Sequence, residues 1–228
     1  MPVYNEEKLI EGVVSGWQRE MSRLPIHYEF LLYDDGSKDN TRAILERISQ
    51  GSPELTAKTQ SNRGHGPTVL RGYAESKGEW ILQIDSDGEI EPSEFAQLWA
   101  SRDSQDLVLG CRQNRQESAL RRSISWSCRT VVRLLFGRGI DDVNTPFRLI
   151  RRARLARILS RIPSDTFAPN VIISGLALRN KWRISQCRVP HRGRKAGVGS
   201  LAGLRIWRAV LRSFCQTVKA AFIAEETR

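Results

Sequence analysis

Two clusters of carboxylates are the residues of this sequence most able to do chemistry. Each follows an apolar run that is typical of a strand: Asp34-Asp35 and Asp85-x-Asp87-x-Glu89. Carboxylates two positions apart at a strand end can converge on one hard cation, which usually completes its shell with substrate phosphates and water. An Asp-rich turn taken alone more often serves turn formation or helix capping. Two such clusters at strand ends, where open α/β sheets bind ligands, favour a site for a phosphorylated ligand and a divalent cation.

Helices and strands alternate along the part of the chain that must position these carboxylates. Apolar residues recur at helical spacing over residues 6–22, and we expect Asn5 to cap this helix. Further strands are expected at 28–33, 55–60, 80–84 and 106–111, and further helices at 40–50, at 67–76 and from Pro92 onward. The alternation predicts an α/β fold built on a sheet of parallel strands. Because almost nothing precedes the first helix, we expect the first strand of this sheet to be truncated.

The two halves of the chain differ sharply in charge. The 228 residues carry a net charge of +11, but residues 1–110 have 11 Lys/Arg against 19 Asp/Glu, whereas residues 111–228 have 25 against 6. This asymmetry predicts an anionic partner for the second half: a nucleic acid, a phosphorylated ligand or an acidic membrane surface. The alternative is a basic face that only keeps the protein in solution. The four cysteines lack CxxC spacing, which is typical of reduced thiols in the cytoplasm.

Two basic amphipathic segments lie in the second half. In the last of them the apolar residues recur every three or four positions, and the basic residues fall mainly off that stripe: Leu204, Trp207, Leu211, Phe214, Val218 and Phe222 against Arg205, Arg208, Arg212 and Lys219. Residues 118–136 repeat the pattern. Such a helix can lie in a membrane interface against anionic lipid. It can equally pack its stripe onto the sheet, because amphipathicity serves both uses.

Four motifs, in order, resemble those of family 2 glycosyltransferases with the GT-A fold. They are Pro2-Val3-Tyr4-Asn5-Glu6-Glu7, Tyr33-Asp34-Asp35-Gly36-Ser37-x-Asp39-x-Thr41, Asn62-x-Gly64-x-Gly66, and Ile84-Asp85-Ser86-Asp87-Gly88-Glu89 followed by Pro92. The second half is similar to the polyprenyl-phosphate sugar transferases, the dolichol-phosphate mannose synthase type, in Gly110-Cys111-Arg112, Asp142-x-x-x-x-Phe147-Arg148 and Arg194-x-x-Gly197-x-x-Ser200. The resemblance implies a Rossmann-like sheet that binds a nucleotide-sugar, flanked by helices, in a GT-A domain over residues 1–200. Residues 201–228 would then form an amphipathic segment at a membrane surface.

The resemblance also implies a role for each matched residue. The donor nucleotide would contact Pro2, Tyr4, Glu6, Tyr33, Asp35, Asp85 and Ser86, with Asp35 hydrogen-bonding the base. Asp87 and Glu89 would hold Mg²⁺ or Mn²⁺. The catalytic residues would be Asp85, Asp87, Arg112 and Arg194, with both arginines on donor phosphate.

Two departures from the family pattern bear on these roles. Glu89 stands where the family usually has glutamine, and its extra negative charge should strengthen the metal site. In the loop of Arg194, Ser200 comes one residue late and Leu201 replaces an expected lysine. Arg192 or Lys195 could supply the lost charge.

The implied reaction is the inverting transfer of a sugar from a GDP- or UDP-sugar to a polyprenyl phosphate, by a peripheral protein on the cytoplasmic face of the membrane. A lipid phosphate is already an anion at neutral pH and needs no strong general base, which fits a sequence without an obvious catalytic histidine. One alternative is a family 2 glycosyltransferase that acts on a saccharide acceptor in cell-envelope polysaccharide synthesis, which would need a carboxylate base. A second is a basic nucleic-acid-binding protein, although no helix-turn-helix, zinc or RNA-binding signature is present.

Overall fold

In the computed structural model, residues 1–113, 119–190 and 204–222 are described. The strands are β1 Pro2–Val3, β2 Phe30–Asp34, β3 Leu55–Thr59, β4 Trp80–Gln83, β5 Leu107–Gln113, β6 Arg148–Arg151 and β7 Ile184–Pro190. The α-helices are α1 Ile10–Met21, α2 Thr41–Gln50, α3 His65–Glu75, α4 Phe95–Ala100, α5 Ala119–Phe136, α6 Arg152–Leu159, α7 Pro169–Arg179 and α8 Leu204–Ala221, and a 3₁₀ turn, Pro92–Glu94, precedes α4.

The strands form two sheets that lie next to each other. One has the order β1-β2-β3 and is parallel throughout; the other has the order β4-β6-β5-β7. The expectation of a parallel sheet is wrong for the second sheet, because β6 runs antiparallel to both β4 and β5. β6 is only four residues long, and its pairing is to segments far away in the chain, so no local pattern predicted it.

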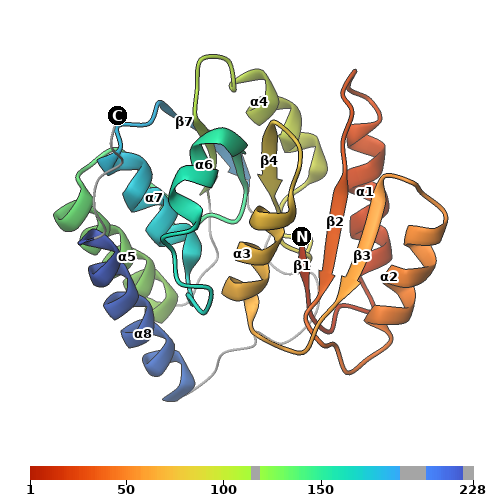
Figure 1. Cartoon of the computed structure of the whole chain (residues 1–228), viewed down its shortest axis with the longest axis horizontal. Coiled ribbons are helices and arrows are strands. Elements are labelled where there is room, and N and C mark those ends of the chain that lie inside the picture. The colour runs from red at the N-terminus through yellow and green to blue at the C-terminus, as the bar shows by residue number, and fades with distance from the viewer. Residues whose placement is uncertain (114–118, 191–203, 223–228) are drawn as a thin grey trace.

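Helices cover both sheets and create two apolar cores. Figure 1 shows α3, α6 and α7 in front of the strands, with α5 and α8 side by side at the end of the molecule opposite to α1 and α2. One core joins α1 to the strands around Trp17, Leu32 and Phe147. The other joins α3, α5 and α7 around Val132 and Ile173. The carboxyl ends of β2 and β4, where the acidic clusters lie, are therefore fixed from both sides.

The first helix begins later than the sequence indicates. It starts at Ile10, not near Asn5, and Leu9 occupies the capping position without a side-chain hydrogen bond. Asn5 is in the left-handed region, with a φ of 52°, and its amide oxygen accepts the backbone N–H of Lys38 at 2.8 Å. Asn5 thus ties the first loop to the loop after β2 instead of capping a helix.

The first strand has only two residues, and a cavity lies beside its N-terminal end. Val3 and Pro2 pair with Asp34 and Tyr33 of β2, and beyond Met1 the edges of β2 and β4 border a cavity of about 620 Å³. The α-amino group of Met1 donates to the carbonyl oxygen of Leu31 at 2.9 Å. Burial lowers the pKa of this amino group to about 5, against the opposing charge of Asp85. This cavity is therefore separate from the pocket that the carboxylates line.

Candidate active site

The Gly-rich turn before α3 is built around the carboxylate of Asp35. Oδ1 of Asp35 accepts hydrogen bonds from Gln60 Nε2 at 2.7 Å and from the backbone N–H of Arg63 at 2.9 Å, and Oδ2 accepts the N–H of Gly64 at 2.8 Å. Gly64 has a φ of 93°, which few residues with a Cβ adopt. Asp35 is buried and fixes the conformation of this turn. Its carboxylate oxygens would therefore already be oriented when a nucleotide binds there.

His65 links the two acidic clusters. It is the first residue of α3, next to Gly64, and its Nε2 lies 2.9 Å from Oδ1 of Asp85. Burial lowers the pKa of His65, but the charges of Asp85 and Asp87 outweigh it, so the pKa is raised overall. Burial likewise raises the pKa of Asp85, yet the charges of His65 and Arg112 and the hydrogen bond to His65 bring it below its usual value. The pair therefore favours an imidazolium beside an ionised carboxylate.

The residues predicted to hold the metal and the diphosphate share one small pocket. Asp85, Asp87, Glu89 and Arg112 line it together, with Ile84, Ile90, Trp17, Pro146 and Phe147 as the apolar wall. The turn that carries the carboxylates is closed by the N–H of Glu89, which donates to Oδ1 of Asp87 at 3.1 Å. Gly88 has a φ of 69°, so a glycine is suited to this position. The structure thus brings together four of the predicted site residues.

Arg112 is fixed by a carboxylate that the sequence analysis had not connected to it. Its Nε and Nη2 donate to Oδ2 and Oδ1 of Asp142 at 2.8 and 3.1 Å, in a bidentate pair of which little is exposed. The loop of Asp142 is held in turn by Arg148, whose fully buried guanidinium donates to the carbonyl oxygens of Val143, Thr145 and Asn170. Such a pair keeps Arg112 in one orientation beside the acidic turn.

The residues predicted to bind the nucleoside include two in the loop after β1, which is hydrogen-bonded to the loop after β2. The N–H groups of Glu6 and Glu7 donate to Thr41 Oγ1 and Asp39 Oδ2, and the N–H of Asn40 donates back to Glu7 Oε2. Glu6 is buried here and Tyr4 is half-buried, while Ser86 is buried in the turn after β4. Tyr4 and Glu6 therefore lie on the loop after β1, which contacts the loop after β2, and Ser86 lies between Asp85 and Asp87; their donor-binding roles stay predictions.

Two residues predicted to contact the nucleotide lie outside the pocket of the carboxylates, and their roles stay predictions. Pro2 and Tyr33 line the cavity beyond β1, not the pocket of the carboxylates. The Tyr33 hydroxyl donates to Oε2 of Glu75 at 3.0 Å, and Arg71 lies over its ring. Glu75 is the last residue of α3, whereas His65, at the site, is the first. A strand alternates its side chains, so the residue before the Asp34-Asp35 pair packs against the helix.

Arg194, Arg192 and Lys195 lie outside the described residues, as does the rest of the loop that was expected to close over the donor. His65 and the Asp142 partner of Arg112 are the site residues that the assignments from sequence missed. Their positions within the motifs could have identified them: His65 lies inside Asn62-x-Gly64-x-Gly66, and Asp142 is the first residue of the segment that ends at Arg148.

The donor set suits a hard divalent cation. Asp87 and Glu89 supply carboxylate oxygens to a pocket that Arg112 also lines, and Mg²⁺ or Mn²⁺ typically takes one or two protein carboxylates together with phosphate oxygens and water. Among the described residues, no three His, Cys, Asp or Glu side chains converge as a ligand set. A metal at this turn would therefore depend on a phosphorylated ligand to complete its shell.

The comparisons with known proteins agree with this geometry. The family model described as glycosyl transferase family 2 matches residues 1–168. The chain is similar to glucosyl-3-phosphoglycerate synthase from Mycobacterium tuberculosis, solved with Mn²⁺, UDP-glucose and phosphoglyceric acid: the TM-score is 0.70 at 16% identity over 99% of this chain and 79% of that one. The complex of the same enzyme with UDP gives a TM-score of 0.69 at 17% identity, with the same coverage. A further mycobacterial protein gives 0.69 at 17% identity, over 99% and 74% of the two chains. The likeness confirms the predicted GT-A fold.

Proposed function

The chain belongs to glycosyl transferase family 2, and we propose that it transfers a sugar from a nucleotide-sugar to the phosphate of a polyprenyl lipid, with inversion and with the help of Mg²⁺ or Mn²⁺. The observation that carries this proposal is the convergence of Asp85, Asp87, Glu89 and Arg112 on one pocket. It lies at the carboxyl end of β4, next to the turn that Asp35 holds.

The charges of this pocket suit the departure of a nucleoside diphosphate. Breaking the anomeric bond leaves negative charge on the diphosphate, and fixed cationic groups stabilise such charge most effectively when they need no rearrangement. Arg112 is fixed by Asp142, and α3 begins at His65, which contacts Asp85, so the positive end of this helix lies beside the acidic turn. A divalent cation on Asp87 and Glu89 would supply further positive charge to the diphosphate. Both UDP- and GDP-sugars fit this scheme, and the neighbours solved with UDP or UDP-glucose favour testing uridine first.

A phosphate acceptor is favoured by the charge of the second half of the chain. That half carries 25 Lys/Arg against 6 Asp/Glu, which would attract an anionic acceptor. A phosphate oxygen is a nucleophile without prior loss of a proton, whereas a sugar hydroxyl needs a base within hydrogen-bond reach. In this pocket Asp85 is already engaged with His65, so it is less suited to act as that base. The neighbouring synthase was solved with phosphoglyceric acid, an anion that carries a carboxylate, a hydroxyl and a phosphate, so that structure supports an anionic ligand and leaves the accepting oxygen to the test below.

The lipid chain of the acceptor distinguishes this proposal from transfer to a diffusible phosphate. A polyprenyl phosphate is embedded in a membrane, so we infer that the enzyme meets it peripherally, on the cytoplasmic face. The four thiols are unpaired in the structure, as is usual in a reducing compartment. None of the described helices is both long and apolar enough to cross a bilayer.

The test supplies radiolabelled UDP- and GDP-sugars with Mn²⁺ and four acceptors. These are a water-soluble short-chain prenyl phosphate, the matching prenyl alcohol, an oligosaccharide and phosphoglycerate. We expect transfer to the prenyl phosphate alone, and loss of transfer in EDTA. Transfer to the oligosaccharide or to phosphoglycerate, but not to the prenyl phosphate, would overturn the acceptor class. Full activity in EDTA would overturn the metal.

A further inference from the structure

In the part of α8 whose side chains are described, small residues pack onto the protein and large apolar residues such as Leu211 and Phe214 lie outside. Ser213, Thr217, Ala220 and Ala221 are buried on the side that meets α5 and α7. Leu211, Phe214 and Phe222 are 62%, 48% and 82% exposed. An amphipathic helix that only covered a core would show the reverse distribution. The exposed side chains of Leu211, Phe214 and Phe222 therefore contribute little to the packing of the described part of this protein.

The neighbouring helix α5 repeats the arrangement. Its Val132 and Phe136 are buried in the core, whereas Trp126 is 62% and Leu134 is 80% exposed. These two side chains, Leu211 and Phe214 of α8, and Phe222 directly after α8 are the only large apolar side chains that are exposed in the described residues. Four of the five therefore belong to two helices that lie side by side at one end of the molecule (Figure 1), and the fifth follows one of them. We call these five side chains the α5–α8 face.

The charges of the two helices are of a single sign. By sequence, residues 119–136 and 204–221 contain eight Lys or Arg and no Asp or Glu. Among the described ones, Arg133 and Lys219 are exposed. A surface that combines exposed aromatic and aliphatic side chains with basic ones fits the interface of an anionic bilayer, where the apolar groups enter the acyl boundary and the cations meet headgroups. A second copy of this chain fits poorly, because twofold pairing would oppose two wholly basic helices.

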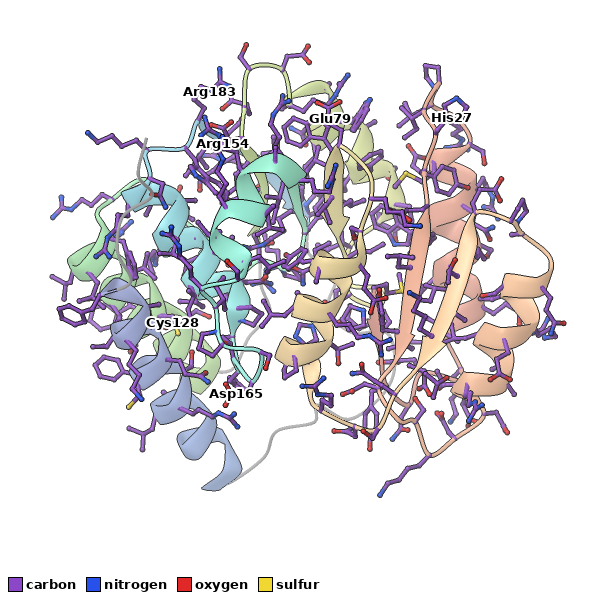
Figure 2. All side chains as sticks on the ribbon, viewed as in Figure 1. His27, Glu79, Cys128, Arg154, Asp165 and Arg183 are labelled. Atoms are coloured by element: carbon purple, nitrogen blue, oxygen red, sulfur yellow. The ribbon has the colours of Figure 1, made fainter. Side chains whose placement is uncertain are left out.

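The α5–α8 face is joined to the active site by one loop. Arg212 of α8 donates to the carboxylate and the carbonyl oxygen of Asp165, and Gln216 accepts the N–H of Phe167. Figure 2 shows Asp165 at the tip of this loop, between α3 and α8. A Cβ on Gly66 would overlap the backbone oxygens of Thr166 and Phe167, so the loop lies directly against the start of α3, one residue from His65. The 165–167 loop thus connects α8 to the start of α3, where His65 contacts Asp85.

We propose that the α5–α8 face docks on the surface of an anionic lipid bilayer and presents the membrane-embedded acceptor to the site. The second clause of this proposal rests on the proposed function; the first does not. Docking buries the apolar side chains that the fold leaves exposed, and large exposed apolar patches rimmed by polar residues commonly mark such surfaces. The attraction contributed by Arg133 and Lys219 should fall as salt is added.

Vesicle flotation tests the docking. The intact protein should float with vesicles of neutral lipid plus about a third anionic lipid at low salt, and should be released by salt or by wholly neutral vesicles. Leu211→Ser/Phe214→Ser/Phe222→Ser should lower the bound fraction by tenfold or more. Arg133→Glu/Lys219→Glu should lower it by roughly fivefold or more for each residue. The matched control is Arg42→Glu/Arg47→Glu, which reverses two exposed charges on α2 and should float like the intact protein.

Two acceptors separate the docking from the chemistry. With the water-soluble prenyl phosphate, both α5–α8 variants should transfer sugar as fast as the intact protein. With a long-chain polyprenyl phosphate in anionic vesicles, both should be slower by tenfold or more. Equal flotation of all the proteins, or no flotation of the intact protein at low salt, would overturn the docking face. No transfer to either acceptor by a protein that floats would overturn the proposed function and leave the docking face in place.

Discussion

The acidic and the basic ends of this molecule hold their charged side chains in opposite ways. At the ends of β2 and β4, the carboxylates of Asp35, Asp39 and Asp85 are all tied to donors within the protein. On α5 and α8, charged groups such as Lys219 share the surface with apolar ones as exposed as Leu134 and Phe222. The first arrangement suits a ligand site, since its groups would need little rearrangement when a ligand arrives. The second can bury its apolar side chains only against another body.

Removing one charge from the acidic end should have the largest effect. Asp87→Asn should slow sugar transfer by about 10³-fold, because it takes a hard, charged ligand from the turn that faces the diphosphate. The thermal unfolding midpoint should change little, since the amide oxygen of Asn can still accept the N–H of Glu89. Steady-state transfer assays and a thermal melt measure the two effects. Asp103→Asn, in the exposed turn before β5, is the matched control.

Normal activity in Asp87→Asn would show that the acidic turn serves only the local fold. The acidic clusters and the basic helices α5 and α8 would then differ only in the sign of their charge, and the acidic clusters would not be a ligand site.

The fold around the acidic end should also gain from a longer first strand. Of four residues joined upstream of Met1, the two nearest to Met1 would face Leu31 and Phe30, in the register that β1 already has with β2. They would lie inside the cavity of about 620 Å³. An added Val-Ser-Ile-Val should raise the free energy of unfolding by about 3 kcal/mol, because it buries apolar side chains and replaces the buried α-amino group with a peptide N–H. Urea unfolding measures the gain.

The control for this extension is Gly-Ser-Gly-Ser, which removes the same amino group but adds little apolar burial. If both extensions leave the stability unchanged, the space between β2 and β4 is not a strand position. A larger gain from Val-Ser-Ile-Val also predicts tighter binding of UDP with Mn²⁺, since β1 leads directly into the loop of Tyr4 and Glu6.

A smaller effect should follow from Glu75, a carboxylate fixed at the far end of α3. Lys58, Arg71 and Tyr33 all donate to it, and the hydrogen bond from Lys58 is the largest reason why its pKa falls to about 2 against the opposing effect of burial. A lowered pKa in the folded state contributes stability above the unfolded value near 4.5, and that contribution is lost as the pH falls toward 2. Glu75→Gln should therefore cost about 2 kcal/mol at pH 7.

Urea unfolding of the Glu75→Gln variant and the parent at several pH values checks the sign. The difference in the free energy of unfolding should be constant from pH 7 to about pH 5 and should shrink below that. A difference that grows as the pH falls would contradict the assignment. Glu79→Gln is the matched control, because Glu79 is mostly exposed and pairs only with Arg151 in the described contacts.

Local patterns predicted what is local in this protein. The strands that end in Asp34 and near Asp85 and the turn glycines follow from apolar runs and Gly-Asp chemistry within a few residues. The antiparallel β6, the Asp142 partner of Arg112 and the inward turn of Tyr33 all depend on segments far apart in sequence. The amphipathic pattern of 201–223 was ambiguous for the same reason. A stripe shows that a face is apolar, but only the packing of Ala220 and Thr217 inward shows which face is left outside.

The smallest change in the free energy of unfolding is expected for exposed apolar residues of α8, at the basic end of the molecule. Leu211→Ser and Phe214→Ser should each change the free energy of unfolding by less than about 0.5 kcal/mol, because these side chains are largely exposed and substitutions at such positions seldom disturb a fold. If the stripe of α8 were part of the core, either change would cost about 2–5 kcal/mol, as truncating a buried leucine or phenylalanine does. Ala220→Leu, on the buried side of the same helix, is the comparison within α8. It should cost about 1–3 kcal/mol, since it forces an added side chain into a packed interface. Urea unfolding of the three variants measures all of these values. If Leu211→Ser and Phe214→Ser lower the free energy of unfolding less than Ala220→Leu does, the side chains of Leu211 and Phe214 are available to contact lipid. If they lower it more, these two side chains are part of the core.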